Sequence, residues 1–148
     1  MALKVARRGQ VPPFIVMDVM RAAFEREAAG ENILHMEVGQ PGTSAPDGVI
    51  EAATRAMQAD RLGYTDALGI PALRDAISAH YNRTYGADVS ADRIAITTGS
   101  SGAFVLAFLA AFDAGDRVAL AAPGYPAYRN ILMALGIDVV EIPVGPET

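Results

Sequence analysis

The sequence predicts an α/β fold in which parallel βαβ units follow an amino-terminal helical arm. Two observations lead to this expectation. From Arg93 onward, short apolar segments typical of buried strands alternate with helical segments, as in right-handed βαβ crossovers of a parallel sheet. Before Arg93, helical patterns are separated by loops rich in Gly and Pro.

The composition is that of a globular protein and excludes several classes of function. Of the 148 residues, 51% are hydrophobic and 20% are charged. A net charge of -5 argues against general binding of nucleic acid. The lack of cysteine and the separation of His35 from His80 predict no metal site, and we interpret both histidines as structural. No segment suggests a signal peptide or a membrane span, so a cytoplasmic location is expected.

The first half of the chain is predicted to hold three helices and one strand. Apolar residues at helical spacing predict a helix from about Ile15 to Ala29, and the alternating segment "ILHMEV" predicts a strand over residues 33–38. A second helix is expected to open near Asp47. In the third, Pro71 suits a first helical turn and Gly86 is a stop signal.

The second half is predicted to hold three parallel strands joined by two helices. The strands are expected over residues 93–98, 117–122 and 138–144, and the helices from about Ser101 to Phe112 and over residues 125–136. The two outer strands of such a sheet each leave one edge without a hydrogen-bonded neighbour. The helix from about Ser101 to Phe112 is apolar on nearly all sides. Both features lead us to expect that the chain is a fragment of a larger protein.

The segment "ITTGSSGAF" is a candidate phosphate site. A strand that leads into a helix through small residues places unpaired backbone N–H groups and the positive end of a helix dipole at one point. The segment matches neither common nucleotide fingerprint. The loop after the next strand, "APGYPAY", presents Tyr125 between Gly124 and Pro126. If the two strands were neighbours, the loops would together suit a planar, phosphorylated ligand. Taken singly, each loop is as well explained by a helix cap or a core tyrosine.

Four motifs resemble those of the class I/II aminotransferases, which are fold type I enzymes that use pyridoxal 5'-phosphate (PLP). They are "EVGQPG", "GYTDALGIPALRDAIS", "ITTGSSGAF" and "APGYPAY", and the likeness covers nearly the whole chain. The resemblance implies an incomplete PLP-dependent transferase fold of the aspartate aminotransferase type. In it, residues 1–45 would form the amino-terminal arm and part of the small domain, and residues 46–148 the first part of the large PLP-binding domain.

The resemblance also implies roles for particular residues. Ser100, Ser101 and Gly102 would lie in the phosphate cup, and Tyr125 would stack on the pyridine ring. Gly39 would face the substrate carboxylate, and Tyr64 would reach the phosphate of a neighbouring subunit in a homodimer. A plain turn glycine and a loop aromatic are the structural alternatives for these last two.

The activity that the resemblance implies is transfer of an amino group between an amino acid and a 2-oxo acid. The lysine that binds the cofactor as a Schiff base, the acidic partner of the pyridinium nitrogen and the arginine for the substrate carboxylate would follow Thr148. The sole lysine here is Lys4, near the amino terminus. We therefore expect no catalytic residue in this stretch, no turnover by it alone, and a lysine farther along the gene.

Three alternatives stay open from the sequence. Another fold type I enzyme, such as a decarboxylase, carbon–sulfur lyase or synthase, would share these motifs. A regulator could keep the fold to sense PLP without turnover, although no DNA-binding segment precedes the motifs. A nucleotide-binding Rossmann-like domain is the third, but no acidic residue is clearly placed for a ribose.

Overall fold

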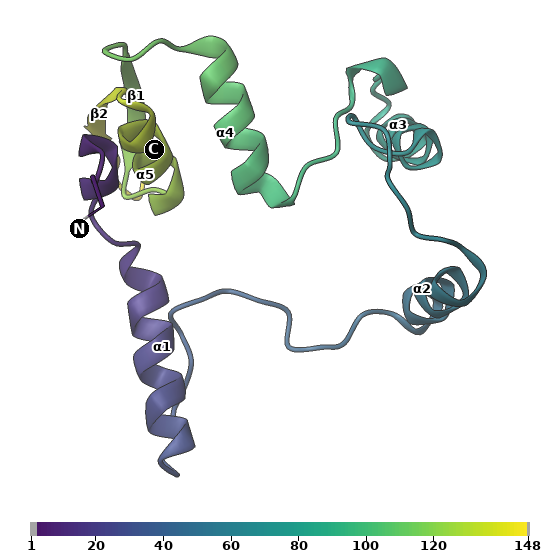
Figure 1. Cartoon of the computed structure of the whole chain (residues 1–148), viewed down its shortest axis with the longest axis horizontal. Coiled ribbons are helices and arrows are strands. Elements are labelled where there is room, and N and C mark those ends of the chain that lie inside the picture. The colour runs from purple at the N-terminus through teal and green to yellow at the C-terminus, as the bar shows by residue number, and fades with distance from the viewer. Residues whose placement is uncertain (1–2, 148) are drawn as a thin grey trace. The chain divides into compact units, whose positions relative to one another are not determined.

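The structure is a computed structural model that describes residues 3–147. The described chain forms two compact units (Figure 1). Unit 1 combines residues 3–39 with residues 98–147, and unit 2 consists of residues 40–97. Unit 1 is therefore built from two stretches that are far apart in the sequence.

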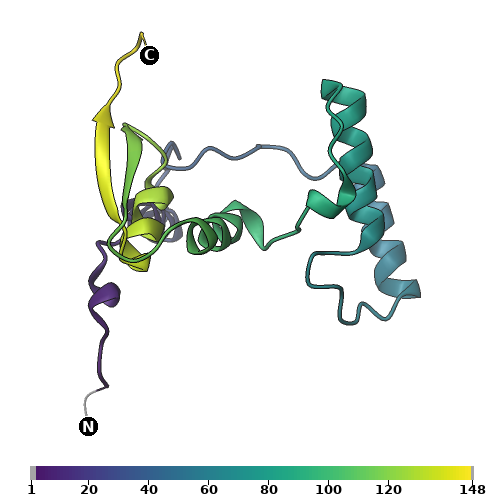
Figure 2. The same ribbon diagram turned by 90° about the horizontal axis from the view of Figure 1, so that it is seen from above.

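The centre of unit 1 is a pair of parallel strands. Strand β1 (Arg117–Ala122) pairs with β2 (Asp138–Pro143), and α5 (Pro126–Leu135) connects them (Figure 2). At the amino-terminal edge, the Gly115 N–H donates to the Gly136 carbonyl at 2.8 Å. At the other edge, the Val144 N–H donates to the Ala122 carbonyl at 2.9 Å. The backbone bonds thus fix the register at both ends.

Two more helices and a short 3-10 turn complete unit 1. Helix α4 (Gly99–Ala111) packs against α5, where the rings of Phe104 and Tyr128 lie 4.5 Å apart. The turn η1 (Arg7–Gln10) also contacts α5 and is followed by α1 (Ile15–Ala28). The amino-terminal arm is thereby joined to the second half of the chain.

Unit 2 consists of α2 (Asp47–Ala59), α3 (Pro71–Tyr85) and the short turn η2 (Ala91–Arg93). The Arg74 guanidinium donates to the Ala91 carbonyl from two nitrogens, at 3.0 and 2.9 Å. The Ser78 hydroxyl donates to the Val89 carbonyl at 2.6 Å. Side chains of α3 therefore hold the segment that follows this helix.

Burial is concentrated at the α5–β2 junction of unit 1. Among the described residues, Leu132 and Ile137 are the buried apolar ones, at 0% and 2% exposure. By contrast, Leu106 and Leu109 of the apolar helix α4 are exposed. Part of the apolar surface of α4 thus lacks a partner within the described chain.

The predicted helices and the two later strands are confirmed within a few residues. Pro71 begins α3, and Gly86 ends it with φ 64°, a left-handed conformation that suits glycine. Strand β1 has the predicted bounds, and β2 ends one residue earlier than predicted.

Two predicted strands are wrong. Residues 33–38 and 93–98 form no strand. A strand needs a hydrogen-bonded neighbour, and the sheet of the described chain contains β1 and β2 alone. Residues 93–98 instead make an isolated bond from the Ile96 N–H to the Leu68 carbonyl at 3.0 Å. The expectation that strand 93–98 would lie next to β1 is corrected accordingly.

We expect Leu132→Ala to lower the free energy of unfolding by about 2–5 kcal/mol, because it removes a fully buried side chain. Chemical denaturation followed by far-UV circular dichroism measures the change. Met133→Ala is the matched control, since its side chain is exposed, and it should cost less than about 1 kcal/mol. Equal losses would contradict a central packing role for Leu132.

Candidate functional site

Tyr125 lies where the carboxyl end of β1 passes into α5. Pro126 occupies the first helical position, and Tyr125 precedes it in extended conformation. The ring of Tyr125 is 49% exposed and meets Phe14 and Tyr128 edge-on, with centroid distances of 6.4 and 5.1 Å. These contacts hold an exposed aromatic ring at the edge of the sheet where ligands of α/β proteins usually bind.

A cavity of about 370 Å³ brings Tyr125 together with Gly39. Both residues line it, although they are far apart in the sequence. The other lining residues come from α1, from the segment after it and from the start of α5: Phe14, Val16, Met17, Glu37, Val38 and Pro126. The cavity therefore has a mostly apolar wall with one carboxylate.

The first turn of α4 contains Ser100, Ser101 and Gly102. N–H groups in a first turn have no carbonyl partner within the helix. The side chain of Thr98, which precedes the helix, makes no capping hydrogen bond, and the first turn carries no acidic residue. Both serines are exposed, and their hydroxyls form no hydrogen bond with the described residues. The serines thus do not serve as helix caps, and their donors are available to an anion.

A row of aromatic rings connects this turn to the cavity. Tyr125 packs on Tyr128, and Tyr128 packs on Phe104 in the second turn of α4, at 5.1 and 4.5 Å. The candidate anion site and the candidate stacking ring therefore belong to one packed unit.

Tyr64 lies in unit 2, on the loop between α2 and α3. Its side chain is fully exposed, at 111% of the reference area. The end of this loop is fixed at Gly69, where φ is 97° and a Cβ would collide with the Ile96 side chain. Tyr64 is therefore presented to solvent from an anchored loop.

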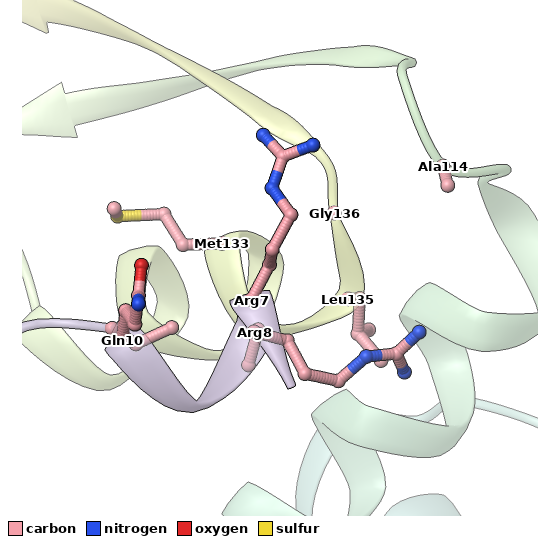
Figure 3. A pocket seen from close by; sticks show the side chains of 9 residues that line it. Arg7, Arg8, Gln10, Ala114, Met133, Leu135 and Gly136 are labelled. Carbon is pink, nitrogen blue, oxygen red and sulfur yellow. The ribbon is translucent and has the colours of Figure 1, made fainter. Parts of the chain in front are cut away.

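A second cavity of unit 1, of about 490 Å³, is lined by Arg7 and Arg8 together with residues of α5 (Figure 3). It lies at the opposite edge of the sheet, because Ala114 and Gly136 on its wall precede β1 and β2. Ligands of open α/β sheets collect at the carboxyl ends of strands. The cavity with Tyr125 is therefore the candidate site.

Sequence reasoning did not find the contribution of α1 to this cavity. Phe14 and Met17 were recognised only as apolar residues at helical spacing, and Glu37 only as part of a strand pattern. Their approach to Tyr125 is a long-range contact that no local motif encodes. The "EVGQPG" motif, which places Glu37 beside Gly39, was the one available signal.

Residues 31–148 match the family "Aminotransferase class I and II". The chain belongs to this family. It is 59% identical over 145 residues to a valine–pyruvate aminotransferase of Mycobacterium tuberculosis, a match that covers 98% of this chain and 37% of that protein. The chain thus spans little more than a third of its relative.

Solved structures of aminotransferases share the fold. A crystal structure of an aminotransferase from Mycobacterium tuberculosis is similar with a TM-score of 0.93 and 58% identity, over 99% of this chain and 38% of that one. The aspartate aminotransferase of Thermus thermophilus with maleate gives a TM-score of 0.92 at 30% identity, over 99% and 38%. The predicted aspartate aminotransferase-like fold, present as a partial α/β structure, is confirmed.

The residues of this chain fit PLP, the cofactor that the family generally uses. A phosphate dianion requires several donors and no adjacent carboxylate, and the first turn of α4 meets both conditions. A pyridine ring requires a flat partner with an exposed face, and Tyr125 is half exposed. In the part of the chain that the structure describes, no cluster of acidic or histidine side chains could hold a metal ion. Nor is any described helix long and apolar enough to cross a membrane.

We expect Gly124→Ala to disturb the Tyr125 loop, because the added Cβ would collide with the Ala121 carbonyl oxygen. A loss of about 1–3 kcal/mol in stability should accompany weaker near-UV circular dichroism from the ring cluster. Gly42→Ala is the control, since its Cβ would meet nothing within 4 Å. An unchanged near-UV spectrum in Gly124→Ala would contradict this description of the loop.

Proposed function

We propose that this chain forms the amino-terminal part of a PLP-dependent aminotransferase that moves an amino group between an amino acid and a 2-oxo acid. The observation that carries the proposal is the shared cavity of Tyr125 and Gly39 in the same unit as the first turn of α4, which contains Ser100, Ser101 and Gly102 and no acidic residue. Family membership supports it. The names of the relatives agree with this activity.

The cofactor would be held by two groups of residues. Ser100, Ser101 and Gly102 would bind its phosphate, with the Ser101 hydroxyl a direct donor. Tyr125 would stack on its pyridine ring and keep water from that face. When bound, PLP supplies the electron sink that amino-group transfer requires.

The remaining assignments concern substrate and assembly. The Gly39 backbone N–H would face the substrate carboxylate. Tyr64 would reach the phosphate site of a second subunit in a cytoplasmic homodimer, and its complete exposure in the described chain supports a partner outside the chain. Residues 1–45 would belong to the arm and small domain, and residues 46–148 to the large domain.

Proton transfer at the substrate needs a lysine that this chain does not supply. Lys4 is its one lysine, and it lines neither the cavity with Tyr125 nor the cavity with Arg7 and Arg8. The chain alone would hold one side of the site without turnover, and the whole protein would add the lysine.

We further propose that the substrate is an aliphatic amino acid such as valine, with pyruvate as the amino acceptor. Phe14, Val16, Met17 and Val38 give the cavity an apolar wall that suits a branched side chain. The Mycobacterium tuberculosis relative named for valine and pyruvate agrees with this choice.

In the full-length protein, Ser101→Ala should weaken PLP binding roughly tenfold to a hundredfold, because one hydroxyl donor to a charged phosphate is lost. Stability should not change, since this hydroxyl caps nothing. Titration of the apo-protein with PLP, followed by absorbance, measures the affinity.

Ser78→Ala is the matched control for this titration. It removes the hydroxyl that binds the Val89 carbonyl and should lower stability by about 1 kcal/mol with PLP affinity unchanged. Parent-like PLP affinity in Ser101→Ala would overturn the phosphate assignment. Tight PLP binding by the parent without amino transfer would favour the regulator instead.

Gly39→Ala should raise KM for L-valine about tenfold, because a methyl group would narrow the cavity where the substrate binds. No protein atom lies within 4 Å of the added Cβ, so the fold should be unaffected. Steady-state kinetics with pyruvate test this, with Gly42→Ala as control. An unchanged KM would place the substrate elsewhere.

A further inference from the structure

The segment that carries Gly39 has little backbone support. Within the described chain, no backbone hydrogen bond joins residues 32–45 to another element. Residues 33–38 are not part of the sheet of the described chain, so within it side chains hold this segment against α1. Within the described chain, these side chains are the contacts that set the position of Gly39 in the cavity.

His35 makes two polar contacts, and one of them reaches α1. Its Nε2 lies 3.0 Å from Glu27 Oε1 on α1, and its Nδ1 lies 2.7 Å from Glu37 Oε1 on the segment itself. The Phe24 ring of α1 covers it at a centroid distance of 5.4 Å. The imidazole therefore joins the helix to the segment through polar and aromatic contacts together.

The two carboxylate contacts together require a protonated imidazole. Ionised carboxylates only accept hydrogen bonds, and a neutral imidazole has a single N–H donor, so it can serve one carboxylate but not two. Glu37, and then Glu27, raises the pKa of His35 above its ordinary value. In return, His35 lowers the pKa of Glu37. Among the described residues these two carboxylates are the charged groups that act on His35.

Glu37 connects this arrangement to the candidate site. Its side chain is 11% exposed, and it lines the cavity together with Val38 and Gly39. When His35 loses its proton, one carboxylate loses its donor. Glu37 on the cavity wall then no longer faces a positive charge, so its own negative charge repels a substrate carboxylate more strongly.

We propose that His35, held between Glu27 and Glu37, is a positioning residue that sets Gly39 in the substrate cavity and makes substrate affinity depend on pH. The substrate part rests on the proposed aminotransferase function. The interaction is fully present below the ordinary pKa of histidine and is lost as pH rises through the raised pKa of His35.

Nuclear magnetic resonance of the full-length protein tests the positioning without turnover. With labelled histidine and glycine, the His35 ring should titrate above pH 6.5, and the Gly39 amide should shift with the same midpoint. His35→Gln and Gly39→Ala assign the two signals. In His35→Gln the shift of the Gly39 amide should disappear, and in Glu27→Gln the midpoint should fall. The control His80→Gln alters the other histidine of this chain. In this variant the shift of the Gly39 amide should persist.

Kinetics with L-valine and pyruvate test the consequence for the substrate. KM of the parent should rise about tenfold as pH passes the His35 midpoint, with a smaller change in kcat. His35→Gln should show a raised KM without this inflection, and His80→Gln should behave as the parent.

Two results would overturn the inference: a His35 titration at or below pH 6.5, or a Gly39 signal and KM profile that survive in His35→Gln. Failure of the parent to bind PLP or transfer an amino group would overturn the proposed function instead. The resonance experiment would still decide the role of His35.

Discussion

Parallel pairing of β1 with β2 requires the chain to return to the same edge of the sheet, and α5 makes that return. The crossover buries Leu132 and Ile137, the two apolar residues that are almost fully buried in the described chain. Because the strands are parallel, their carboxyl ends share one edge, and the loop that carries Tyr125 leaves from there. The cavity with Gly39 lies beside this loop, whereas the cavity with Arg7 and Arg8 lies at the other edge. The shared direction of β1 and β2 is thus the reason why the cavity with Tyr125 and Gly39 is the candidate site.

Features with local causes could be predicted from the sequence. Pro71, Gly86 and Gly136 mark helix ends through their own backbone preferences, and the structure places helix ends at each of them. The apolar pattern predicted strands over residues 117–122 and 138–144. These two predictions hold because each segment provides the hydrogen bonds that the other needs. Residues 93–98 have the same apolar pattern, but pattern alone gives no partner. Their Ile96 N–H bonds to a loop carbonyl at Leu68 instead.

The residues of the candidate site also fall into those with local causes and those that depend on long-range contacts. Ser101 and Tyr125 stand in short motifs whose geometry follows from a strand end or a helix start, so they could be proposed as candidates from the sequence. Phe14, Met17 and Glu37 reach the cavity through the path of α1, which depends on contacts across most of the chain. The sequence favours a structural role for His35, and its contacts with Glu27 and Glu37 are interactions through which it can fulfil that role. Their origin on two different elements could not be read from spacing.

The contact between the arm and α5 has a consequence for synthesis. The Asn130 amide donates to the Pro12 carbonyl across 118 positions of sequence. A ribosome adds about 5–20 residues per second, so the arm waits on the order of ten seconds before α5 has been made. Contacts of unit 2, such as Ser78 with Val89 and Arg74 with Ala91, span far shorter stretches and can form meanwhile. The arm is thus the first part of unit 1 to leave the ribosome and among the last to dock.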